Sequence, residues 1–473
     1  MPGNAFWIDR IPELCYTGEK EAKAGKRGIT VEISYRKKLP VRYSVDVMVA
    51  GGGPAGVAAA VAAARDGKSV LVVEKFSAFG GAAATMLVPA FMTFGDGEHF
   101  LAGGIGREIY DRIGDEAPDR FKAYCPACIP IETLKRIYDD MLLSAGAEIL
   151  LYTDVIDAIR EGDRIRYAVC SARNEIFAVE AKIYIDCTGE GDLSYYAGAE
   201  SEFGDENGKV MAATLCGIWN GIDWSRVKKP DERRLEDAFL DHVFTNEDRH
   251  LPGMWPLASQ SGDGRADGVG GSNAGHVYDV DPRSSVSLTK GTVEARKQLL
   301  EYRKYFREYL SGYENAELLI TAPYLGIREG RRITGDYKMV LDDFIRRADF
   351  EDEIGRYSYP VDIHAPVNDR AGYEKYHEEF MKYRYGKGES YGISYRALAV
   401  KGIENLLVAG RAISSDRYMQ SSLRVMPGCF ITGQAAGLAA SIASEGEGDV
   451  HGIRVTELRR RLKKLGAYLP DHA

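Results

Sequence analysis

The feature that most constrains this sequence is a glycine-rich turn, Gly51-Gly-Gly53-Pro-Ala-Gly56, set between two apolar segments. Residues 45–50 are mostly apolar and predict a buried parallel strand, and the alanine-rich segment 54–65 predicts a helix that Asp66-Gly67 ends. Glycines at this spacing allow a tight turn and let a pyrophosphate approach the helix N-terminus, where unpaired N–H groups favour anions. The G-x-G-x-x-G pattern alone is weak, but here it has the strand and the helix that the motif requires. The sequence therefore predicts a dinucleotide-binding turn.

The segment that follows supports this interpretation. Residues 69–74 predict a second strand, which ends in Glu74, 23 residues after Gly51. A carboxylate at this place accepts hydrogen bonds from a ribose diol and repels the additional phosphate of NADP. Strand, turn, helix and strand together form a βαβ unit, so we predict an α/β, Rossmann-like domain with a doubly wound sheet.

The rest of the chain predicts that this domain is discontinuous. Residues 404–410 return to a buried strand, and residues 427–444 predict a helix of small residues. In residues 201–392, before this strand, the composition changes: Tyr, Arg and His are more frequent, and there is a long polar loop. We predict an FAD-type domain at 41–200 and 393–450, an inserted α+β substrate or cap domain at 201–392, an N-terminal arm at 1–40 and a C-terminal helix at 451–473. Further helices are expected near 131–144 and 290–310, a strand at 318–325, and a meander of antiparallel strands at 148–151, 155–159, 164–171 and 175–179, with a separate strand at 182–186.

Composition narrows the class of protein. Lys and Arg number 61 against 70 Asp and Glu, so the net charge is −9, which disfavours a nucleic-acid partner. Seven irregularly spaced cysteines predict reduced thiols and a cytoplasmic location. The N-terminus lacks the features of a signal peptide, and the longest apolar stretch, 45–64, contains Asp46 and four glycines, so we expect no membrane insertion. We also predict no metal site.

Two further segments favour a flavin over NAD. Residues 75–85 form a loop with Gly80-Gly81, where an NAD domain normally continues with a third βα unit. Residues 405–411, followed by 424–430, predict a strand, loop and helix whose N–H groups could stabilise a reduced flavin ring. Gly103–Gly106 and Gly268–Gly271 are expected to lack the strand and helix of a second fingerprint, so a separate NAD(P)H site is not predicted.

The chain resembles the FAD-dependent oxidoreductase family, with a glutathione-reductase-like FAD domain distantly similar to that of fumarate reductase and succinate dehydrogenase flavoproteins. The segments that carry the resemblance are Gly51–Gly56, Gly80–Thr85, Ile185–Asp192, Leu325–Arg332, Tyr391–Arg396 and Leu407–Arg411 through Pro427. The resemblance implies FAD, and because residues 82–84 are alanines, with no histidine for covalent attachment, we expect noncovalent FAD.

The resemblance also implies which residues hold the cofactor. Glu74 and Lys75 are expected on the adenosine side, Gly81 to Thr85 at the flavin, Thr188 and Gly189 at the nucleotide, and Gly410, Arg411 and Arg424 at the ribityl chain and ring. The full predicted set is Gly51, Gly53, Pro54, Ala55, Gly56, Glu74, Lys75, Gly81, Ala82, Thr85, Val155, Thr188, Gly189, Asp192, Gly410, Arg411 and Arg424.

Hydride transfer between a substrate and a flavin needs a proton acceptor and a group that positions the substrate. His276 and His364 are the candidate proton partners, although a single histidine is more often structural. Arg328 is the candidate clamp, because a guanidinium binds carboxylates in a bidentate manner, whereas Arg332 is expected to pair with Glu329.

Several other groups are expected to have structural roles. Tyr395 and Arg396 are expected where the two domains meet. Cys125-Pro-Ala-Cys128 has redox spacing but lies outside a flavin motif, so we expect two structural thiols. The basic run 459–464 is expected to be a solvated helix face.

The sequence thus predicts an enzyme that transfers a hydride between a small organic substrate (a sugar, an alcohol or an organic acid) and flavin N5 at the domain interface, with an unknown electron acceptor or donor. An NAD(P)H-dependent flavin monooxygenase, a halogenase-like enzyme or an ene-reductase is the alternative. A second alternative is a nucleic-acid-modifying flavoprotein or a flavin-binding regulator.

Overall fold

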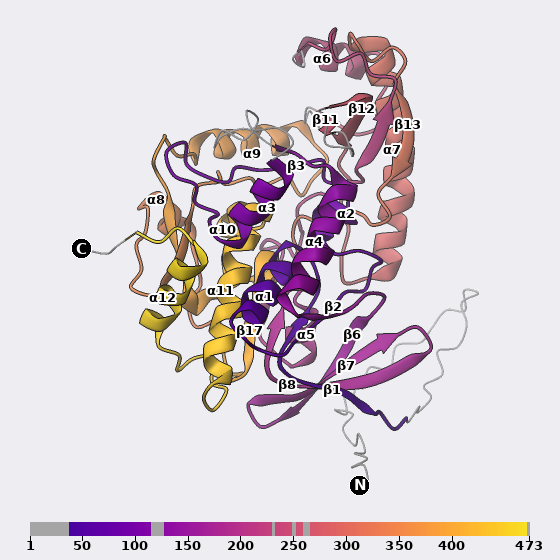
Figure 1. Cartoon of the computed structure of the whole chain (residues 1–473). Helices are drawn as coiled ribbons and strands as arrows, with labels where there is room; N and C mark the ends of the chain where they lie inside the picture. The colour runs from indigo at the N-terminus through magenta and orange to yellow at the C-terminus, as the bar shows by residue number, and fades with distance from the viewer. Residues whose placement is uncertain (1–36, 115–126, 229–231, 248–251, 259–264, 471–473) are drawn as a thin grey trace, which may run out of the picture.

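The computed structural model describes residues 37–114, 127–228, 232–247, 252–258 and 265–470 (Figure 1). Its centre is a sheet in the order β5-β2-β1-β8-β7-β6, to which β17 is added beside β8. Strands β5, β2, β1, β8 and β17 run parallel, whereas β8, β7 and β6 form an antiparallel meander. The expectation that residues 148–151 belong to this meander is wrong, because β5 pairs in parallel with β2. These strands are β1 (Val41–Ala50), β2 (Val70–Val73), β5 (Glu148–Leu150), β6 (Asp154–Glu161), β7 (Arg164–Ala172), β8 (Glu175–Asp186) and β17 (Leu406–Val408). The predicted α/β fold is confirmed.

One strand replaces two that the sequence predicts separately. β8 continues without a break through residues 180–181, because it pairs with β7 along its first half and with β1 along most of its length. Its last residue, Asp186, aligns with Ala50 of β1 and with Val408 of β17. The carboxyl ends of these parallel strands therefore meet at one edge of the sheet, where ligands of α/β proteins bind.

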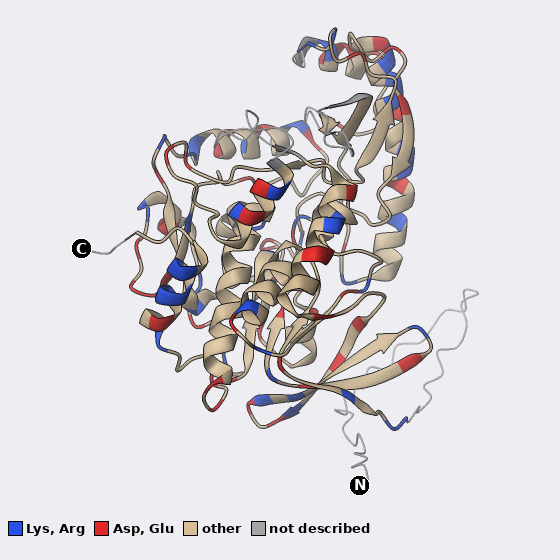
Figure 2. Cartoon of the chain, viewed as in Figure 1, with Lys and Arg blue, Asp and Glu red and all other residues tan. Residues whose placement is uncertain are grey.

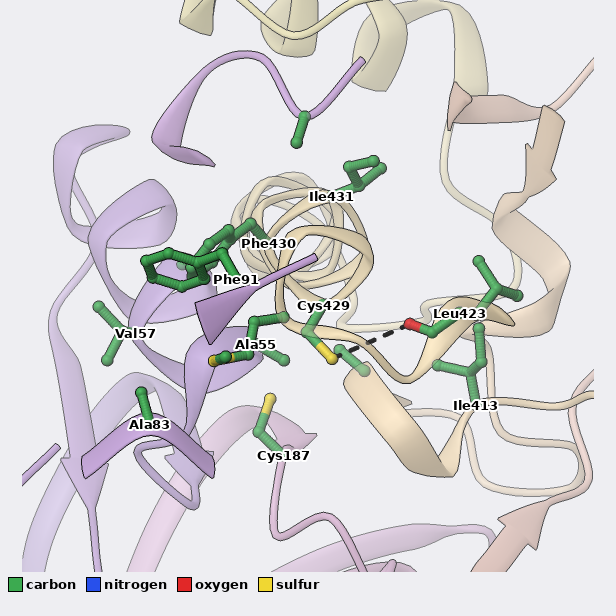
Figure 3. Packing of buried hydrophobic residues seen from close by; sticks show 14 of the residues in the cluster. Ala55, Val57, Ala83, Phe91, Cys187, Ile413, Leu423, Cys429, Phe430 and Ile431 are labelled. Carbon is green, nitrogen blue, oxygen red and sulfur yellow. Dashed lines mark hydrogen bonds between the residues drawn. The ribbon is translucent and has the colours of Figure 1, made fainter. Parts of the chain in front are cut away.

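The C-terminal part of the chain closes this sheet. Helix α11 (Met426–Ser444) packs along α1 (Pro54–Arg65), as the close-up in Figure 3 shows around Ala55 and Cys429. Glycine makes the contact possible: a Cβ on Gly433 would lie 2.2 Å from the carbonyl oxygen of Ala55, and one on Gly437 would lie 2.2 Å from that of Ala59. The small residues of both helices thus serve helix-to-helix packing.

The middle of the chain builds a second layer of structure above the sheet (Figure 1). Its antiparallel sheet has the order β11-β12-β10-β13 and lies beside the long helix α7. Its elements are β10 (Gly217–Asn220), α6 (Glu232–Leu240), β11 (Gly253–Ala258), β12 (Arg265–Asn273), α7 (Ser285–Tyr309) and β13 (Glu317–Thr321). The domain boundaries given above stay predictions.

Two element boundaries in this part differ from the sequence prediction. α7 begins at Ser285 rather than near residue 290, because the Ser284 side chain caps it by accepting from the Ser287 N–H. β13 ends at Thr321 rather than at residue 325, and Pro323, which lacks an N–H, lies two residues further on.

The remaining elements connect these layers. They are α2 (Gly81–Ala84), β3 (Ala90–Phe91), α3 (Ile105–Gly114), β4 (Ala127–Cys128), α4 (Ile131–Ala145), α5 (Asp192–Tyr196), β9 (Ser201–Phe203), β14 (Arg331–Ile333), α8 (Leu341–Ile345), β15 (Glu353–Tyr357), α9 (Arg370–Lys382), β16 (Tyr391–Ser394), α10 (Arg417–Leu423) and α12 (Val455–Leu465). α3 corrects one expectation: a helix does follow Gly103–Gly104, although no strand leads directly into that turn.

Charge is distributed over the fold with both signs mixed (Figure 2). The basic run lies on α12, where its arginines contact this chain's own groups: Arg459 donates to the carbonyl of Glu353, Arg460 pairs with Glu457, and Arg461 pairs with Glu445. Among the described residues no single helix is long and apolar enough to cross a membrane; α10 and α11 together meet that test by length and composition, with a bend of 93°.

Candidate functional site

A cavity of about 970 Å³ lies at the carboxyl edge of the parallel sheet. It is bounded by the turns that follow β1, β2, β8 and β17. The predicted cofactor residues that line it are Gly51, Gly53, Pro54, Ala55, Glu74, Lys75, Gly81, Ala82, Thr85, Val155, Thr188, Gly189, Asp192, Gly410, Arg411 and Arg424. The structure thus brings together residues that are more than 370 positions apart in the sequence.

Gly56, in contrast, does not line the cavity among the described residues. A Cβ at this position would lie 1.8 Å from the carbonyl oxygen of Gly51, so this glycine is needed for close packing inside the turn. Gly51 itself has φ +92°, and a Cβ there would lie 2.6 Å from the carbonyl oxygen of Cys187. Both glycines serve the backbone of the turn.

Gly53 has a different role. Its φ of −69° is open to any residue, and the nearest neighbour that a Cβ would meet is Gly81 Cα at 4.0 Å. The space beside Gly53 belongs to the cavity, at the N-terminus of α1, whose first N–H groups have no partner within the helix. The missing side chain therefore leaves room for a ligand at an anion-binding helix end.

Buried carboxylates fix the turns around the cavity. Glu74 accepts hydrogen bonds from the N–H groups of Gly52 (2.8 Å) and Phe76 (2.9 Å), and burial raises its pKa. Asp186 accepts from the Thr188 hydroxyl (2.7 Å) and the Ser194 hydroxyl (2.8 Å). The sequence analysis missed Asp186, although its place at the carboxyl end of β8 was a signal for it.

Arg411 connects this cavity to a second one. Its guanidinium pairs with Glu190 and donates to the carbonyl oxygens of Gly189 (2.8 Å) and Ile327 (2.6 Å). These contacts hold Arg411 at the common wall of the two cavities. Its side chain is therefore a fixed part of the wall.

The second cavity has a volume of about 750 Å³ and lies between the sheet edge and the inserted segment. It shares Ala82, Met86, Arg411, Arg424 and Met426 with the first cavity. Its remaining lining residues are Val88, Ala90, Met92, Thr214, Cys216, Asn273, Gly326, Ile327, Arg328, Tyr359, Asp362, His364 and Val425. Two of the three predicted catalytic residues, His364 and Arg328, are in this set.

The two candidate histidines form one hydrogen-bonded pair. His364 Nδ1 lies 2.9 Å from His276 Nε2, and His364 Nε2 lies 3.5 Å from Asp362 Oδ1. Burial and the Arg328 guanidinium lower the pKa of His364 well below its ordinary value, against the opposing effect of Asp362. His276 is buried behind His364 and does not itself line the second cavity. His364 is therefore neutral at neutral pH and is the histidine that a ligand in the cavity can reach.

Asp362 is a functional candidate that the sequence analysis missed. Burial raises its pKa, but His364 and the guanidinium groups of Arg424 and Arg328 have a larger opposite effect and lower the pKa to well below its ordinary value. Tyr359 donates to its carboxylate at 3.2 Å and Arg424 at 3.3 Å. The one signal for it was its position two residues before His364, which was itself a candidate.

Arg328 lines the same cavity. It donates to the carbonyl of Ala212 and the hydroxyl of Thr214, both at 2.7 Å, and to Asn273 Oδ1 at 3.3 Å. Arg332, as predicted, pairs with buried Glu329 at 2.7 Å instead.

Other predicted residues lie outside both cavities. Tyr395 is buried and donates to the carbonyl of Val450, and Arg396 is half exposed and pairs with Asp352. Cys125 lies outside the described residues, so the role of the Cys125–Cys128 pair stays a prediction. Within the described part of the chain, no group of three or more His, Cys, Asp or Glu side chains is placed to hold a metal ion.

Two cysteines that the sequence analysis did not single out line the first cavity. Figure 3 shows Cys187 and Cys429 next to Ala55, where α1 and α11 pack. Burial raises the pKa of Cys429 to about 12 and that of Cys187 well above its ordinary value. Both groups are therefore protonated thiols and poor nucleophiles at neutral pH.

Together, the glycine turn, the parallel sheet and the cavity at its carboxyl edge define a dinucleotide-binding α/β enzyme. A family model described as FAD dependent oxidoreductase matches residues 46–462. Because this match spans most of the 473 residues, the chain belongs to the FAD-dependent oxidoreductase family, is an oxidoreductase and uses FAD.

Solved structures of low sequence identity resemble the chain over most of its length. A geranylgeranyl bacteriochlorophyll reductase-like protein from Thermoplasma acidophilum is 13% identical, with 89% of this chain and 83% of that chain covered and a TM-score of 0.43. The flavin-dependent brominase Bmp2 is 14% identical over 88% and 83% of the two chains (TM-score 0.45), and p-nitrophenol 4-monooxygenase PnpA from Pseudomonas putida DLL-E4 is 13% identical over 89% and 84% (TM-score 0.42). None of these similarities carries a substrate or a reaction over to this chain.

The first cavity fits FAD on structural grounds. The space beside Gly53 would be filled by any side chain larger than hydrogen, and it lies at a helix N-terminus suited to a pyrophosphate. Glu74 and Thr188 provide polar groups along the same cavity, and Gly410 provides a turn with φ +80° directly before Arg411.

Proposed function

We propose that the chain oxidises or reduces a small organic molecule bound in the second cavity, with FAD held in the first. The observation that carries this proposal is that the two cavities share a wall that includes Met86, Arg411 and Arg424, while His364 and Asp362 face the second cavity. When bound, FAD supplies two-electron chemistry: it accepts the hydride that an alcohol carbon loses as its C=O bond forms, or donates one in the reverse direction.

In this proposal His364 is the proton partner. In the neutral tautomer that has its proton on Nδ1, His364 donates a hydrogen bond from Nδ1–H to His276 Nε2. The Nε2 atom of His364 is then free of a proton and can accept the hydroxyl proton of the substrate. The imidazolium so formed faces the Asp362 carboxylate at 3.5 Å, which stabilises its charge. His276 is then a positioning residue that fixes the tautomer of His364, which replaces the expectation that either histidine acts alone.

Arg328 positions the substrate in this proposal. Its guanidinium is held by Ala212, Thr214 and Asn273, so it enters the cavity wall in one orientation. A fixed donor costs little conformational entropy when the substrate binds, which favours a reactive geometry.

The experiment is anaerobic titration of the purified holoprotein with sugars, polyols, hydroxy acids, amines and NAD(P)H, while the flavin absorbance is followed. Bleaching by an organic compound without nicotinamide supports the proposal and gives the substrate class. Bleaching by NAD(P)H alone overturns it in favour of the monooxygenase, halogenase-like or ene-reductase alternative.

A further inference from the structure

The two arginines in the wall that both cavities share differ in where their carboxylate partners lie. Arg411 pairs with Glu190, and both of these residues line the first cavity. Arg424 pairs with Asp362 at 3.3 Å, and Asp362 lines the second cavity but is not among the described residues that line the first. The first cavity therefore borders both charges of the Arg411 pair, but only the positive charge of the Arg424 pair.

The local fold holds the Arg424 side chain at this wall. Helix α10 ends directly before Arg424, and α11 begins two residues after it, at Met426, with a bend of 93° between the two helices. Pro427 lies in the first turn of α11, where its missing N–H costs nothing. The guanidinium is fixed at its other end, because Nη2 donates to the backbone carbonyl of Asp362 at 2.9 Å as well as to its carboxylate.

These charges lie where water screens them poorly. The side chain of Arg424 is 11% exposed and that of Asp362 is 22% exposed. A charge with little water around it acts more strongly on its neighbours than a charge on the surface. Met426, the first residue of the 19-residue helix α11, lines both cavities, so the positive end of the helix dipole adds to the field of Arg424 at the wall.

The direction of FAD in the first cavity brings its ring to the same wall. The helix end beside Gly53 suits the pyrophosphate, and Glu74 suits the ribose diol of the adenosine half. Within the described part of the chain, both residues line the first cavity and neither lines the second. The other end of the cofactor, which is the flavin ring, is then next to the second cavity, where it can exchange a hydride with a substrate.

We propose that Arg424 sets the reduction potential of the bound flavin, because its guanidinium makes the first cavity bind reduced FAD more tightly than oxidised FAD. This rests on the proposed function, which places the ring at the shared wall. The ring takes up two electrons and one proton when it is reduced to its anionic form, so it gains one negative charge, and a fixed cation beside it favours that form. Arg411 has a smaller effect, since Glu190 opposes its charge on the same side of the wall.

The test is the reduction potential of the flavin in the holoprotein, measured anaerobically at equilibrium with a reference dye and without any organic substrate. Arg424→Gln should lower the ratio of reduced-FAD to oxidised-FAD affinity by about 10- to 100-fold, which lowers the potential by about 30–60 mV for a two-electron couple. Arg424→Lys keeps the positive charge, so its potential should lie closer to that of the unmodified protein than to that of Arg424→Gln.

Two further variants separate the charge of Arg424 from general damage to the site. Lys75→Gln removes a cation that lines the first cavity but, among the described residues, is not part of the second; its Nζ lies 5.4 Å from the ring centres of Phe76 and Tyr324. This variant should leave the potential unchanged, even where FAD binds more weakly. Asp362→Asn removes the opposing charge with little change in shape and should raise the potential, which is the opposite of the effect of Arg424→Gln.

Each outcome decides the role of Arg424. An unchanged potential in Arg424→Gln, or an equal decrease in Lys75→Gln, overturns the proposal. If Arg424→Gln does not fold or does not retain FAD, Asp362→Asn decides: a raised potential supports the role of Arg424, and an unchanged or lower one overturns it.

The dye measurement is also independent of the proposed function, because it needs no organic substrate. If an organic compound reduces the flavin but the potential does not respond to Arg424→Gln, the proposed function stands and the role of Arg424 is wrong. If the potential responds as expected but no organic compound reduces the flavin, the role of Arg424 stands and the proposed function is wrong.

Discussion

Replacing Asp362 by Asn tests whether the Asp362 carboxylate stabilises His364 when this histidine accepts a proton from the substrate. Asn has nearly the same shape and still accepts a hydrogen bond from Tyr359, but it removes the negative charge that lies 3.5 Å from His364 Nε2. Because the pKa of Asp362 is far below its ordinary value, this carboxylate is ionised throughout any practical assay range. The substitution therefore isolates the charge.

The size of the effect follows from that distance. At an effective dielectric constant of ~20, two unit charges 3.5 Å apart interact by about 5 kcal/mol. The Asn carbonyl retains a hydrogen bond worth roughly 1–2 kcal/mol, so the imidazolium loses on the order of 3 kcal/mol of stabilisation. If the proton reaches His364 in the rate-limiting step, flavin reduction slows by about 100-fold.

The assay is anaerobic rapid mixing of the holoenzyme with a reducing substrate, with the flavin absorbance recorded in a single turnover. The limiting rate should fall while flavin content stays unchanged. Tyr359→Phe is the control: it removes one hydrogen bond to Asp362 but keeps the charge, and should change the rate by less than tenfold. A rate for Asp362→Asn within about fivefold of the unmodified enzyme would refute the reasoning.

Three further predictions concern the cofactor, the packing and the pH dependence. Gly53→Val should fold but lose FAD, because its side chain enters the cavity from a position where a Cβ has Gly81 Cα, at 4.0 Å, as its nearest neighbour; flavin content and circular dichroism check this, and a folded variant that retains FAD would contradict it. Gly433→Ala should destabilise the fold by about 1–3 kcal/mol, because its Cβ would lie 2.2 Å from the backbone oxygen of Ala55; chemical unfolding measures this, with Gly446→Ala as control. The acid limb of kcat/KM should lie below pH 6.5, because the pKa of His364 is depressed. His364 should also contribute a loss of folding stability as pH falls below 6.5, because the unfolded chain then binds a proton at this residue that the folded chain does not; the difference between the pH–stability curves of the unmodified protein and His364→Gln isolates this contribution.

Much of the cofactor cavity was predictable because its residues follow strands of one parallel sheet. Gly53, Glu74 and Thr188 each lie within three residues of the end of a strand of alternating or continuous apolar character, so a local pattern places each of them at the same edge. Gly56 shows the limit of this reasoning: the motif requires it, but the structure uses it for packing against Gly51 and not for the cavity wall.

The substrate cavity was less predictable because its polar groups come from irregular segments. His276 and His364 are 88 residues apart, and their hydrogen bond depends on two loops that no local periodicity describes. Asp362 was overlooked for the same reason. Strand β13, which the apolar pattern extends to residue 325, ends at Thr321 just before Pro323, and so the segment that leads to Arg328 is a loop rather than a strand.

The measurement that tests the central claim most directly is the single-turnover rate of flavin reduction in His364→Gln, followed anaerobically with the substrate that reduces the unmodified enzyme. The account predicts a variant that binds FAD normally and whose flavin is reduced roughly 10²- to 10⁴-fold more slowly, the usual contribution of a positioned proton acceptor. Reduction at the unmodified rate, with full flavin content, would contradict the assignment of the second cavity as the place where substrate and cofactor meet.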